Sequence, residues 1–183
     1  MESPRRPLRQ EWLTWNDVDQ LVDVLLPQLR SAGTFDAMIM ITRGGIVPGG
    51  LLSEALDITN VLTAAVDFPR ELDRDDKARL LVWPSFLQFP DDSLVAGRRI
   101  VIVDDVWGSG RTSTAVKSRC EAAGAASAFT CVFHFNPYRS LFRNAQPDFY
   151  GAVTDAYIVY PWEIDRGLHG IPSNVPPGVK PEN

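Results

Sequence analysis

The sequence predicts an α/β fold in which a mostly parallel central sheet is flanked by helices. Two observations lead to this prediction. Short apolar runs of strand length alternate with segments of helical periodicity, and the clearest run, at residues 100–103, leads through a glycine-rich turn into a helix. Strands joined through helices lie parallel, with right-handed crossovers. A length of 183 residues favours one domain, spanning residues 1–183.

Composition and charge exclude several classes of protein. Apolar residues make up 45% of the chain and charged residues 22%, as is typical of a globular protein. The net charge of −5 argues against a nucleic-acid surface, and no apolar run is long enough to span a membrane. Cys120 and Cys131 lack metal-ligand spacing and fit a reducing compartment. We expect a cytoplasmic protein.

The first elements follow from periodicity and end signals. Apolar residues recur at helical spacing from Trp15, and Thr14 with Asp17 forms a capping box at the start of this helix. Gly33 is a plausible end, while Pro27 is expected to kink or shorten the helix. A buried strand at 37–41, a helix at 47–56 and a second strand at 61–66 are predicted to follow.

Residues 67–97 differ from the rest of the chain. Their first half is dense in charge, their second half is more apolar, and three prolines interrupt them. A connection of this length in a compact domain is usually functional. We therefore expect a lid or hood here, part of which pairs as a hairpin.

The second half of the chain alternates more regularly. A strand at 98–105 precedes a turn at 108–110 and a helix at 112–123, which Gly124 ends. Further strands are predicted at 128–135 and, as a last short one, at 157–160. The residues after Pro161 are rich in glycine and proline and are expected on the surface.

The end of the strand at 98–105 carries the clearest chemistry. Ligands of parallel sheets bind beyond the carboxyl ends of the strands, where Asp104 and Asp105 lie. The following turn opens a helix, whose free N–H groups favour a phosphate, and Ser109 and Thr112 add hydroxyl groups. Carboxylates beside a phosphate suit sugar hydroxyls and a divalent cation. The pattern favours a phosphorylated ribose over the alternative, an ordinary loop.

Four segments extend this interpretation to a known family. Residues 99–112, RIVIVDDVWGSGRT, resemble the phosphoribosyl pyrophosphate (PRPP) motif of type I phosphoribosyltransferases. Residues 42–49, TRGGIVPG, resemble the pyrophosphate loop of the bacterial xanthine-guanine branch. The opening of that branch is similar to residues 13–15, and its closing base-site segment is similar to residues 157–163. The four segments stand in the family's order over most of the chain.

The resemblance implies roles for the sugar and phosphate site. Asp104 and Asp105 would hold the ribose hydroxyls, with Mg²⁺ bridging ribose and pyrophosphate oxygens. Arg43 and the backbone of Gly44 would hold pyrophosphate, so that these residues form the catalytic centre. The 5-phosphate would lie on the turn formed by Gly108, Ser109, Gly110, Arg111 and Thr112.

The resemblance also implies a base site at about residues 155–183, where the departures from the family bear on function. Tyr157 would stack on a purine, and Ile158 would offer backbone groups. Asn136 stands where relatives carry a lysine that binds a 6-oxo group, and Gly108 stands where they carry an acidic residue. His134 is read as structural rather than catalytic. Trp107 either stacks on ligand or packs.

Two functions remain open. The first is a purine phosphoribosyltransferase of purine salvage, slow because Gly108 has no acid–base group. It would use PRPP and a purine base, need Mg²⁺, and form a homodimer or homotetramer. The second is a PRPP- or nucleotide-binding regulatory protein on the same fold, with weak or no activity.

Overall fold

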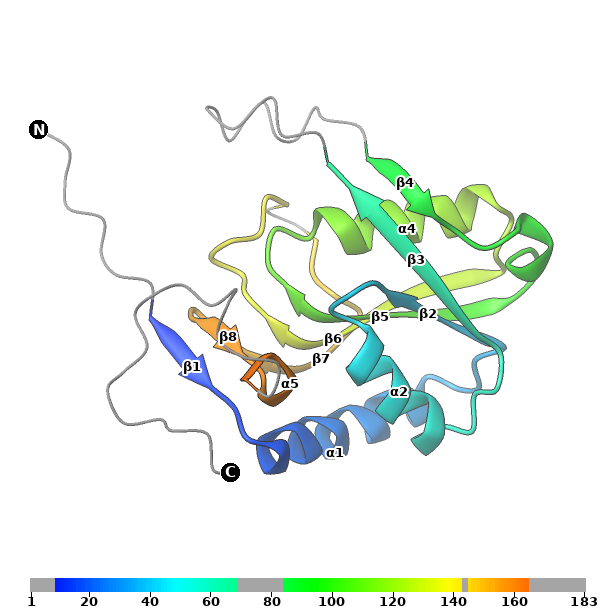
Figure 1. The fold of residues 1–183 in the computed structure, drawn as a ribbon. Helices are drawn as coiled ribbons and strands as arrows, with labels where there is room; N and C mark the ends of the chain where they lie inside the picture. Colours follow the sequence, from blue (N-terminus) through cyan, green and yellow to red (C-terminus); the bar gives the residue numbers. More distant parts are fainter. Residues whose placement is uncertain (1–8, 69–83, 143–144, 165–183) are drawn as a thin grey trace, which may run out of the picture.

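A six-stranded sheet forms the centre of the molecule (Figure 1). The computed structural model describes residues 9–68, 84–142 and 145–164. In these residues the strand order is β4-β3-β2-β5-β6-β7, and only the β3–β4 pair is antiparallel. The strands are β2 Ala37–Ile41, β3 Val61–Asp67, β4 Ser85–Gln88, β5 Arg99–Trp107, β6 Ser127–Phe135 and β7 Phe149–Val153. The predicted α/β class with a mostly parallel sheet is confirmed.

The order of the strands creates a switch point between β2 and β5. From β2 the chain crosses through α2 (Ile46–Ala55) to β3 on one side, whereas from β5 it crosses through α4 (Arg111–Ala122) to β6 on the other. Right-handed crossovers in opposite directions place the two helices on opposite faces. The loops after β2 and β5 therefore meet at one edge, where ligands of such sheets bind.

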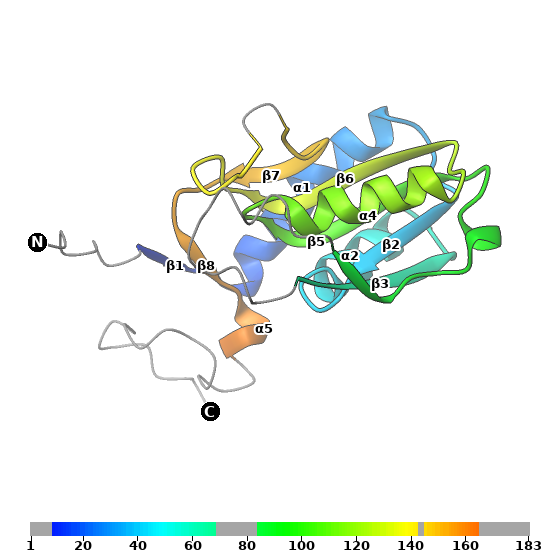
Figure 2. The ribbon, with the colours of Figure 1, turned by 90° about the horizontal axis from the view of Figure 1, so that it is seen from above.

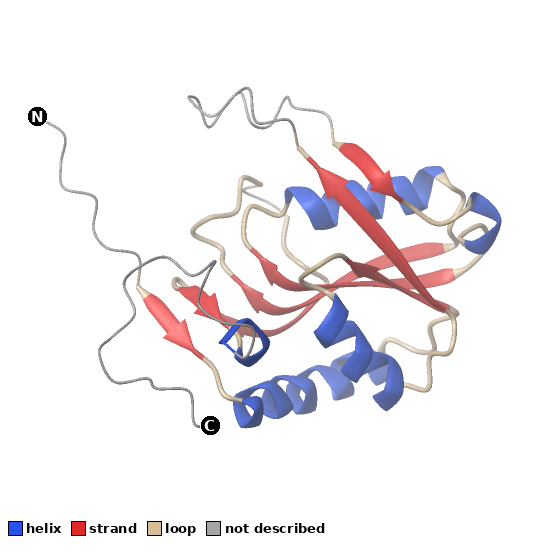
Figure 3. Cartoon of the chain, in the orientation of Figure 1, coloured by secondary structure: helices blue, strands red, loops and turns tan. Residues whose placement is uncertain are grey.

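Helices cover both faces of the sheet (Figures 2 and 3). On one face, α1 (Trp15–Ser31) and α2 pack on a core that includes Leu25, Leu52 and Val101, all fully buried. On the other face, α4 packs through Val116 and Cys120. No helix among the described residues is long and apolar enough to cross a membrane.

A separate two-stranded sheet joins the two ends of the described chain. Its strands are β1 (Gln10–Trp12) and β8 (Tyr157–Val159), which pair in parallel. The short helix α5 (Pro161–Ile164) follows β8. This sheet lies beside the carboxyl ends of β5 and β6 (Figures 1 and 2), so it borders the edge at which the loops meet.

The structure differs from the predicted elements at four places. The capping box of Thr14 and Asp17 is confirmed, but α1 continues through Pro27 to Ser31. Strand β5 runs two residues beyond Asp105, because Val106 and Trp107 still pair with β6. The short strands β1 and β7 and the short helix α5 were not predicted. Within the expected hood, β4 pairs with β3, a short 3-10 helix spans Asp92–Leu94, and residues 69–83 lie outside the described residues.

Candidate functional site

The loop after β2 lies directly against the two carboxylates of β5. A Cβ atom on Gly44 would stand 2.5 Å from Oδ1 of Asp105 and 2.6 Å from Oδ1 of Asp104. Only a residue without a side chain allows this approach. The next residue, Gly45, packs as closely against the backbone carbonyl of Val103. The sequence-predicted pyrophosphate loop and ribose carboxylates are therefore adjacent.

Asp104 and Asp105 form a tightly packed pair. The Asp105 N–H donates to Oδ1 of Asp104 at 3.0 Å, and the Val106 N–H donates to Oδ1 of Asp105 at 2.6 Å. Burial raises the pKa of Asp104 well above its usual range, and the Asp105 charge adds to this. Burial likewise raises the pKa of Asp105 to about 6, with a further contribution from the Glu163 charge. Two carboxylates in this environment favour an arriving cation or hydroxyl donors.

The turn after β5 presents an uncapped helix N-terminus. Gly110 precedes α4 with a positive φ of 80°, and no side chain caps the helix there. The Trp107 indole packs against Gly110 so closely that an added Cβ would lie 2.5 Å from it. Trp107 thus packs under the turn, and its Nε1 donates to Ser140 at 3.4 Å. Such an N-terminus offers N–H groups to an anion.

Other residues of the predicted phosphate turn lie around this helix start. Ser109 is exposed, and Thr112 is half-buried. The Arg111 guanidinium stacks on the Phe68 ring, 3.9 Å from its centroid. Gly108 is half-buried, its φ is not positive, and an added Cβ would meet no atom within 4 Å. Arg43 is exposed on the facing loop, so the turn and the pyrophosphate loop share one edge.

The predicted base segment, residues 157–163, has one backbone edge, in β8, that faces away from β1. The Tyr157 N–H donates to the Arg9 carbonyl, and the Leu13 N–H donates to the Val159 carbonyl. In a parallel ladder alternate residues bond to the same neighbour, so the N–H and C=O of Ile158 point away from β1. The Ile158 side chain is buried, whereas Tyr157 is only partly covered. In β8, a partly covered aromatic ring therefore lies next to an outward-facing backbone edge.

Asn136 lies at the end of β6, buried to 1% exposure. Its Oδ1 accepts from the N–H groups of Tyr138 at 3.1 Å and Arg139 at 3.2 Å. Its Nδ2 donates to the Ala156 carbonyl at 3.5 Å, and its N–H to the Trp107 carbonyl at 2.9 Å. Asn136 borders the base segment, but its side-chain carbonyl is engaged with backbone.

The sequence did not predict a buried hydrogen-bond chain behind the carboxylates. The Tyr160 hydroxyl donates to the Asp105 carbonyl at 3.1 Å and lies 2.8 Å from Nδ1 of His134. Since that hydroxyl donates to Asp105, it accepts from His134, whose Nδ1 carries the proton. Burial lowers the pKa of His134 to about 4, so the imidazole is neutral. His134 therefore has a structural position, as predicted.

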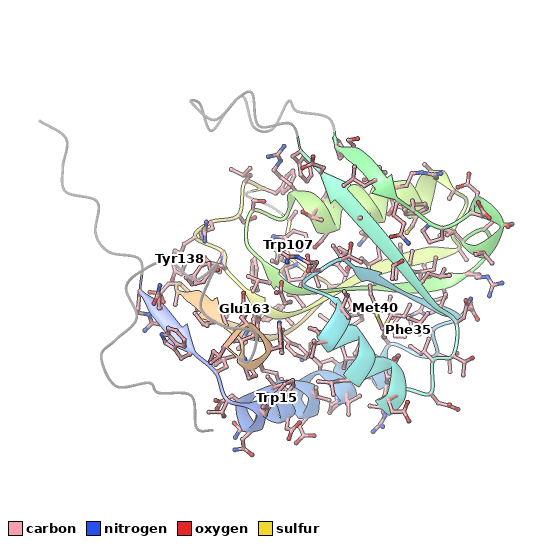
Figure 4. The ribbon with its side chains drawn as sticks, in the orientation of Figure 1. Trp15, Phe35, Met40, Trp107, Tyr138 and Glu163 are labelled. Carbon is pink, nitrogen blue, oxygen red and sulfur yellow. The ribbon has the colours of Figure 1, made fainter. Side chains whose placement is uncertain are left out.

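Glu163 is a second group that sequence reasoning passed over. It accepts the Tyr160 N–H at 2.9 Å, and its charge acts on Asp105 and on Tyr157. Figure 4 shows Glu163, Trp107 and Tyr138 at one end of the sheet, far from Phe35 at the other. Pro161 followed two residues later by Glu163 is typical of a helix start. This pattern could have identified the helical turn, but it could not have shown that Glu163 lies near Asp105.

The described residues contain no group of three or more His, Cys, Asp or Glu side chains arranged to hold a metal ion. Asp104 and Asp105 supply oxygen ligands, the type that Mg²⁺ prefers. Magnesium in phosphate sites is held by one or two carboxylates and completed by water and substrate oxygens. The pair therefore fits a magnesium ion that arrives with a phosphorylated ligand.

Comparison with known proteins agrees with this geometry. The family model described as phosphoribosyl transferase domain matches residues 12–162. Among curated proteins, the xanthine-guanine phosphoribosyltransferase of Cereibacter sphaeroides is 34% identical over 87 residues. That match covers 47% of this chain and 48% of the relative, so the chain matches about half the length of that relative.

Solved structures share the fold over most of the chain. The purine phosphoribosyltransferase of Pyrococcus horikoshii is 29% identical with a TM-score of 0.68, over 84% of this chain and 93% of that one. A protein from Neisseria gonorrhoeae with bound ppGpp is 22% identical with a TM-score of 0.71, over 88% and 95%. The second likeness concerns the fold alone.

Proposed function

Because this chain belongs to the type I phosphoribosyltransferase family, in its purine branch, we propose that it transfers the 5-phosphoribosyl group of PRPP to a purine base. A nitrogen of the base forms a bond to C1 of the ribose. The bond from C1 to the pyrophosphate oxygen breaks, and pyrophosphate leaves with the electron pair. The proton that the base nitrogen carries passes to water.

One observation supports this proposal most: the contact between the Gly44 backbone and the carboxylates of Asp104 and Asp105. PRPP carries pyrophosphate on C1 of its ribose, next to the vicinal hydroxyls. A ligand of this shape needs a pyrophosphate loop and hydroxyl acceptors side by side. Arg43 is exposed on the same loop, where it would donate to pyrophosphate, whose charge grows as it leaves.

The remaining parts of PRPP have matching groups in the same edge of the sheet. The uncapped start of α4, with Gly108, Ser109, Gly110, Arg111 and Thr112, suits the 5-phosphate. Asp104 and Asp105 would hold Mg²⁺ together with ribose and pyrophosphate oxygens. When bound, the ion neutralises charge on the leaving group.

Tyr157 and Ile158 are the groups we propose for the base. The Tyr157 ring offers a stacking face, and the outward backbone edge of Ile158 offers one donor and one acceptor to the base edge. Asn136 borders this site from the end of β6. Gly108 supplies no acid or base, so we propose slow turnover; the loss of such a group costs about 10²–10⁴-fold in rate.

The second candidate, a PRPP- or nucleotide-binding regulatory protein, is favoured by Gly108 and Asn136, the two departures from the family pattern. A protein that only binds PRPP needs the phosphate and hydroxyl sites but no acid–base group. Incubation with PRPP, Mg²⁺ and each of hypoxanthine, guanine, xanthine and adenine distinguishes the two. Chromatography should detect the nucleotide, and an assay should detect pyrophosphate. Calorimetric binding of PRPP without any product would favour the regulatory protein.

We also propose the setting in which the protein works. Cys120 and Cys131 are free, buried thiols, and burial raises the pKa of both above the usual thiol value. Unpaired thiols are compatible with the reducing cytoplasm. A homodimer or homotetramer is proposed from the family resemblance.

A further inference from the structure

We propose that Trp107 and Ser140 are positioning residues for the 5-phosphate, because they hold the glycine-rich turn at 108–110 in the conformation that directs its N–H groups at that phosphate. This inference rests on the proposed function, since it concerns how one part of the same site is held. The sequence left two roles open for Trp107, stacking on the ligand or packing. The indole is 3% exposed, so it is too deeply buried to stack on a ligand.

The loop after β6, which spans residues 136–142, is attached to the turn by two backbone bonds. The Asn136 N–H donates to the Trp107 carbonyl at 2.9 Å, just before the turn, and the Leu141 N–H donates to the Ser109 carbonyl at 3.1 Å, within it. The first bond continues the ladder between β5 and β6, whereas the second requires the loop to keep its position. The loop therefore supports the turn from one side.

These two bonds set the direction of two N–H groups in the turn. In a trans peptide unit the N–H points opposite to the C=O of the preceding residue. The carbonyls of Trp107 and Ser109 face the loop. The N–H groups of the residues that follow them, Gly108 and Gly110, therefore point away from it. Within the part of the chain that the structure describes, neither N–H donates to another residue, so both are available to an anion.

The indole of Trp107 supports the turn from beneath Gly110. Gly110 has a φ of 80°, and an added Cβ would stand 2.5 Å from both Nε1 and Cε2 of the indole. The indole therefore fills the space in which another residue would place its side chain. On its other side the ring makes a T-shaped contact with Phe135 of β6, with 6.5 Å between centroids. A displaced indole would consequently displace Gly110 and the N–H that it carries.

Ser140 attaches the indole to the loop. The Trp107 Nε1–H donates to the Ser140 Oγ at 3.4 Å. The same hydroxyl donates to the Phe142 carbonyl at 3.1 Å and accepts from the Phe142 N–H at 3.4 Å. A serine hydroxyl has one donor and two acceptor positions, and all three are used here. The hydroxyl is thus fixed in the orientation that accepts from the indole.

Calorimetry with three probes tests this arrangement without requiring turnover. Ribose 5-phosphate needs the turn, pyrophosphate with Mg²⁺ needs the Arg43 loop, and PRPP with Mg²⁺ needs both. Ser140→Ala and Trp107→Phe should each weaken the binding of ribose 5-phosphate and of PRPP by about 2- to 10-fold, the range that one neutral hydrogen bond contributes. The binding of pyrophosphate should not change.

Further variants separate positioning from a general loss of stability. The double variant should bind ribose 5-phosphate no more weakly than either single variant, because both changes break the same bond. Ser140→Thr keeps the hydroxyl and should retain the affinity of the unaltered protein. Ser31→Ala is the matched control, because it removes an exposed hydroxyl that donates to the Gln28 carbonyl of its own helix, and it should change nothing.

The bond between Trp107 and Ser140 can be observed directly by NMR of the indole N–H groups. The chain has five tryptophans, and the signal that is missing in Trp107→Phe belongs to Trp107. That signal should shift in Ser140→Ala and on addition of ribose 5-phosphate, and it should not move with pyrophosphate and Mg²⁺. If Trp107→Phe does not fold, the affinities of Ser140→Ala and Ser140→Thr decide.

Unchanged binding of ribose 5-phosphate in folded Ser140→Ala, with PRPP still bound, would overturn this inference and leave the proposed function standing. Equal losses for all three probes would also overturn it, because they would indicate a general structural role. Additive losses in the double variant would overturn the joint role of the two residues. If the unaltered protein binds none of the three probes, the proposed function and this inference both fail.

Discussion

The hydroxyl of Tyr160 donates to the backbone carbonyl of Asp105 at 3.1 Å, and so joins the base segment to the strand that carries the two carboxylates. Tyr160 is 1% exposed, and its ring stacks on Trp162 with 4.4 Å between centroids. Because Tyr160 is buried and held on two sides, it fixes the backbone of Asp105 rather than its carboxylate.

Tyr160→Phe keeps the stacked ring and removes the hydroxyl. The Asp105 carbonyl loses its donor and His134 loses its acceptor, so the free energy of unfolding should fall by about 1–3 kcal/mol. PRPP should also bind more weakly, because the carboxylates lose a backbone support. Urea denaturation and calorimetry measure the two effects. Tyr138→Phe alters a tyrosine that is 79% exposed and should leave both unchanged.

Asp104→Asn combined with Asp105→Asn should abolish Mg²⁺-dependent binding of PRPP. Each charge-assisted hydrogen bond contributes about 1.5–3 kcal/mol, and the cation loses its protein ligands. Calorimetry with and without Mg²⁺ measures the loss. The matched control is Asp19→Asn with Asp23→Asn, which removes the same charge from the exposed face of α1. Unchanged affinity in a folded double variant would remove these carboxylates from the site.

The raised pKa of Asp105 gives stability a defined dependence on pH. The pKa of the Asp105 carboxyl is near 3.8 in the unfolded protein and about 6 in the folded protein. The protonated carboxyl therefore stabilises the folded protein fully below pH 3.8, and this stabilisation is lost as the pH rises through 6. The free energy of unfolding of Asp105→Asn, relative to that of the unaltered protein, should therefore increase by about 1 kcal/mol between pH 5 and pH 7. Urea denaturation at the two pH values measures this difference. A constant difference would contradict the shift.

The affinity for PRPP with Mg²⁺ should also depend on the ionisation of Asp105, but it should increase with pH whereas stability decreases. A protonated carboxyl binds no cation, so affinity should decrease as the pH falls below about 6, where Asp105 takes up a proton. Calorimetry across this range, in buffers of different ionisation enthalpy, should show proton release on binding at pH 6. Equal affinity at pH 5 and pH 7 would count against a direct role of Asp105.

Gly108→Asp places a carboxylate at the position where the family resemblance implies an acidic residue. The structure accommodates it, because an added Cβ meets no atom within 4 Å and the backbone is not left-handed there. The rate with a 6-oxopurine should rise, by up to the 10²–10⁴-fold that an acid–base group contributes. Gly108→Ala adds the Cβ without the carboxylate and should not accelerate the reaction. Gly110→Asp should instead destabilise the protein, since φ is 80° and Trp107 blocks the side chain.

The parts of the fold that sequence could predict are those governed by local patterns. The strand Ala37–Ile41 is apolar throughout and was predicted with its observed bounds, as was the capping box of Thr14 and Asp17. Strand β5 was predicted to end at Asp105, because two carboxylates look like a loop. Pairing of Val106 with His134 extends it, and pairing depends on a distant segment that local sequence does not reveal.

In the candidate site, too, the sequence predicted the contacts between neighbouring residues but not those between distant segments. Asp104, Asp105 and the glycine-rich turn are adjacent in sequence, so their proximity followed from the chain. The contact of Gly44 with the carboxylates, the bond from Tyr160 to Asp105 and the links of Asn136 to Ala156 join separate segments. These depend on side-chain rotamers and on the register of neighbouring strands. Asn136 was therefore located near the base segment, while its bonds to Tyr138 and Arg139 were not foreseen.

The pairing of β1 with β8 bears on the order in which the protein assembles. Gln10 and Tyr157 are neighbours in space but are far apart in the sequence, so a ribosome must synthesise residues 10–157 before they can meet. Closing so long a loop costs chain entropy, and only three residue pairs of β1 and β8 stabilise the closed state, so such contacts form late. The β2–β3 and β5–β6 pairs can form earlier, since one helix joins the strands of each pair. A nascent chain should therefore form the edge proposed for the phosphates first and the β1–β8 sheet proposed for the base last, and loss of that two-stranded sheet should be the first step of unfolding.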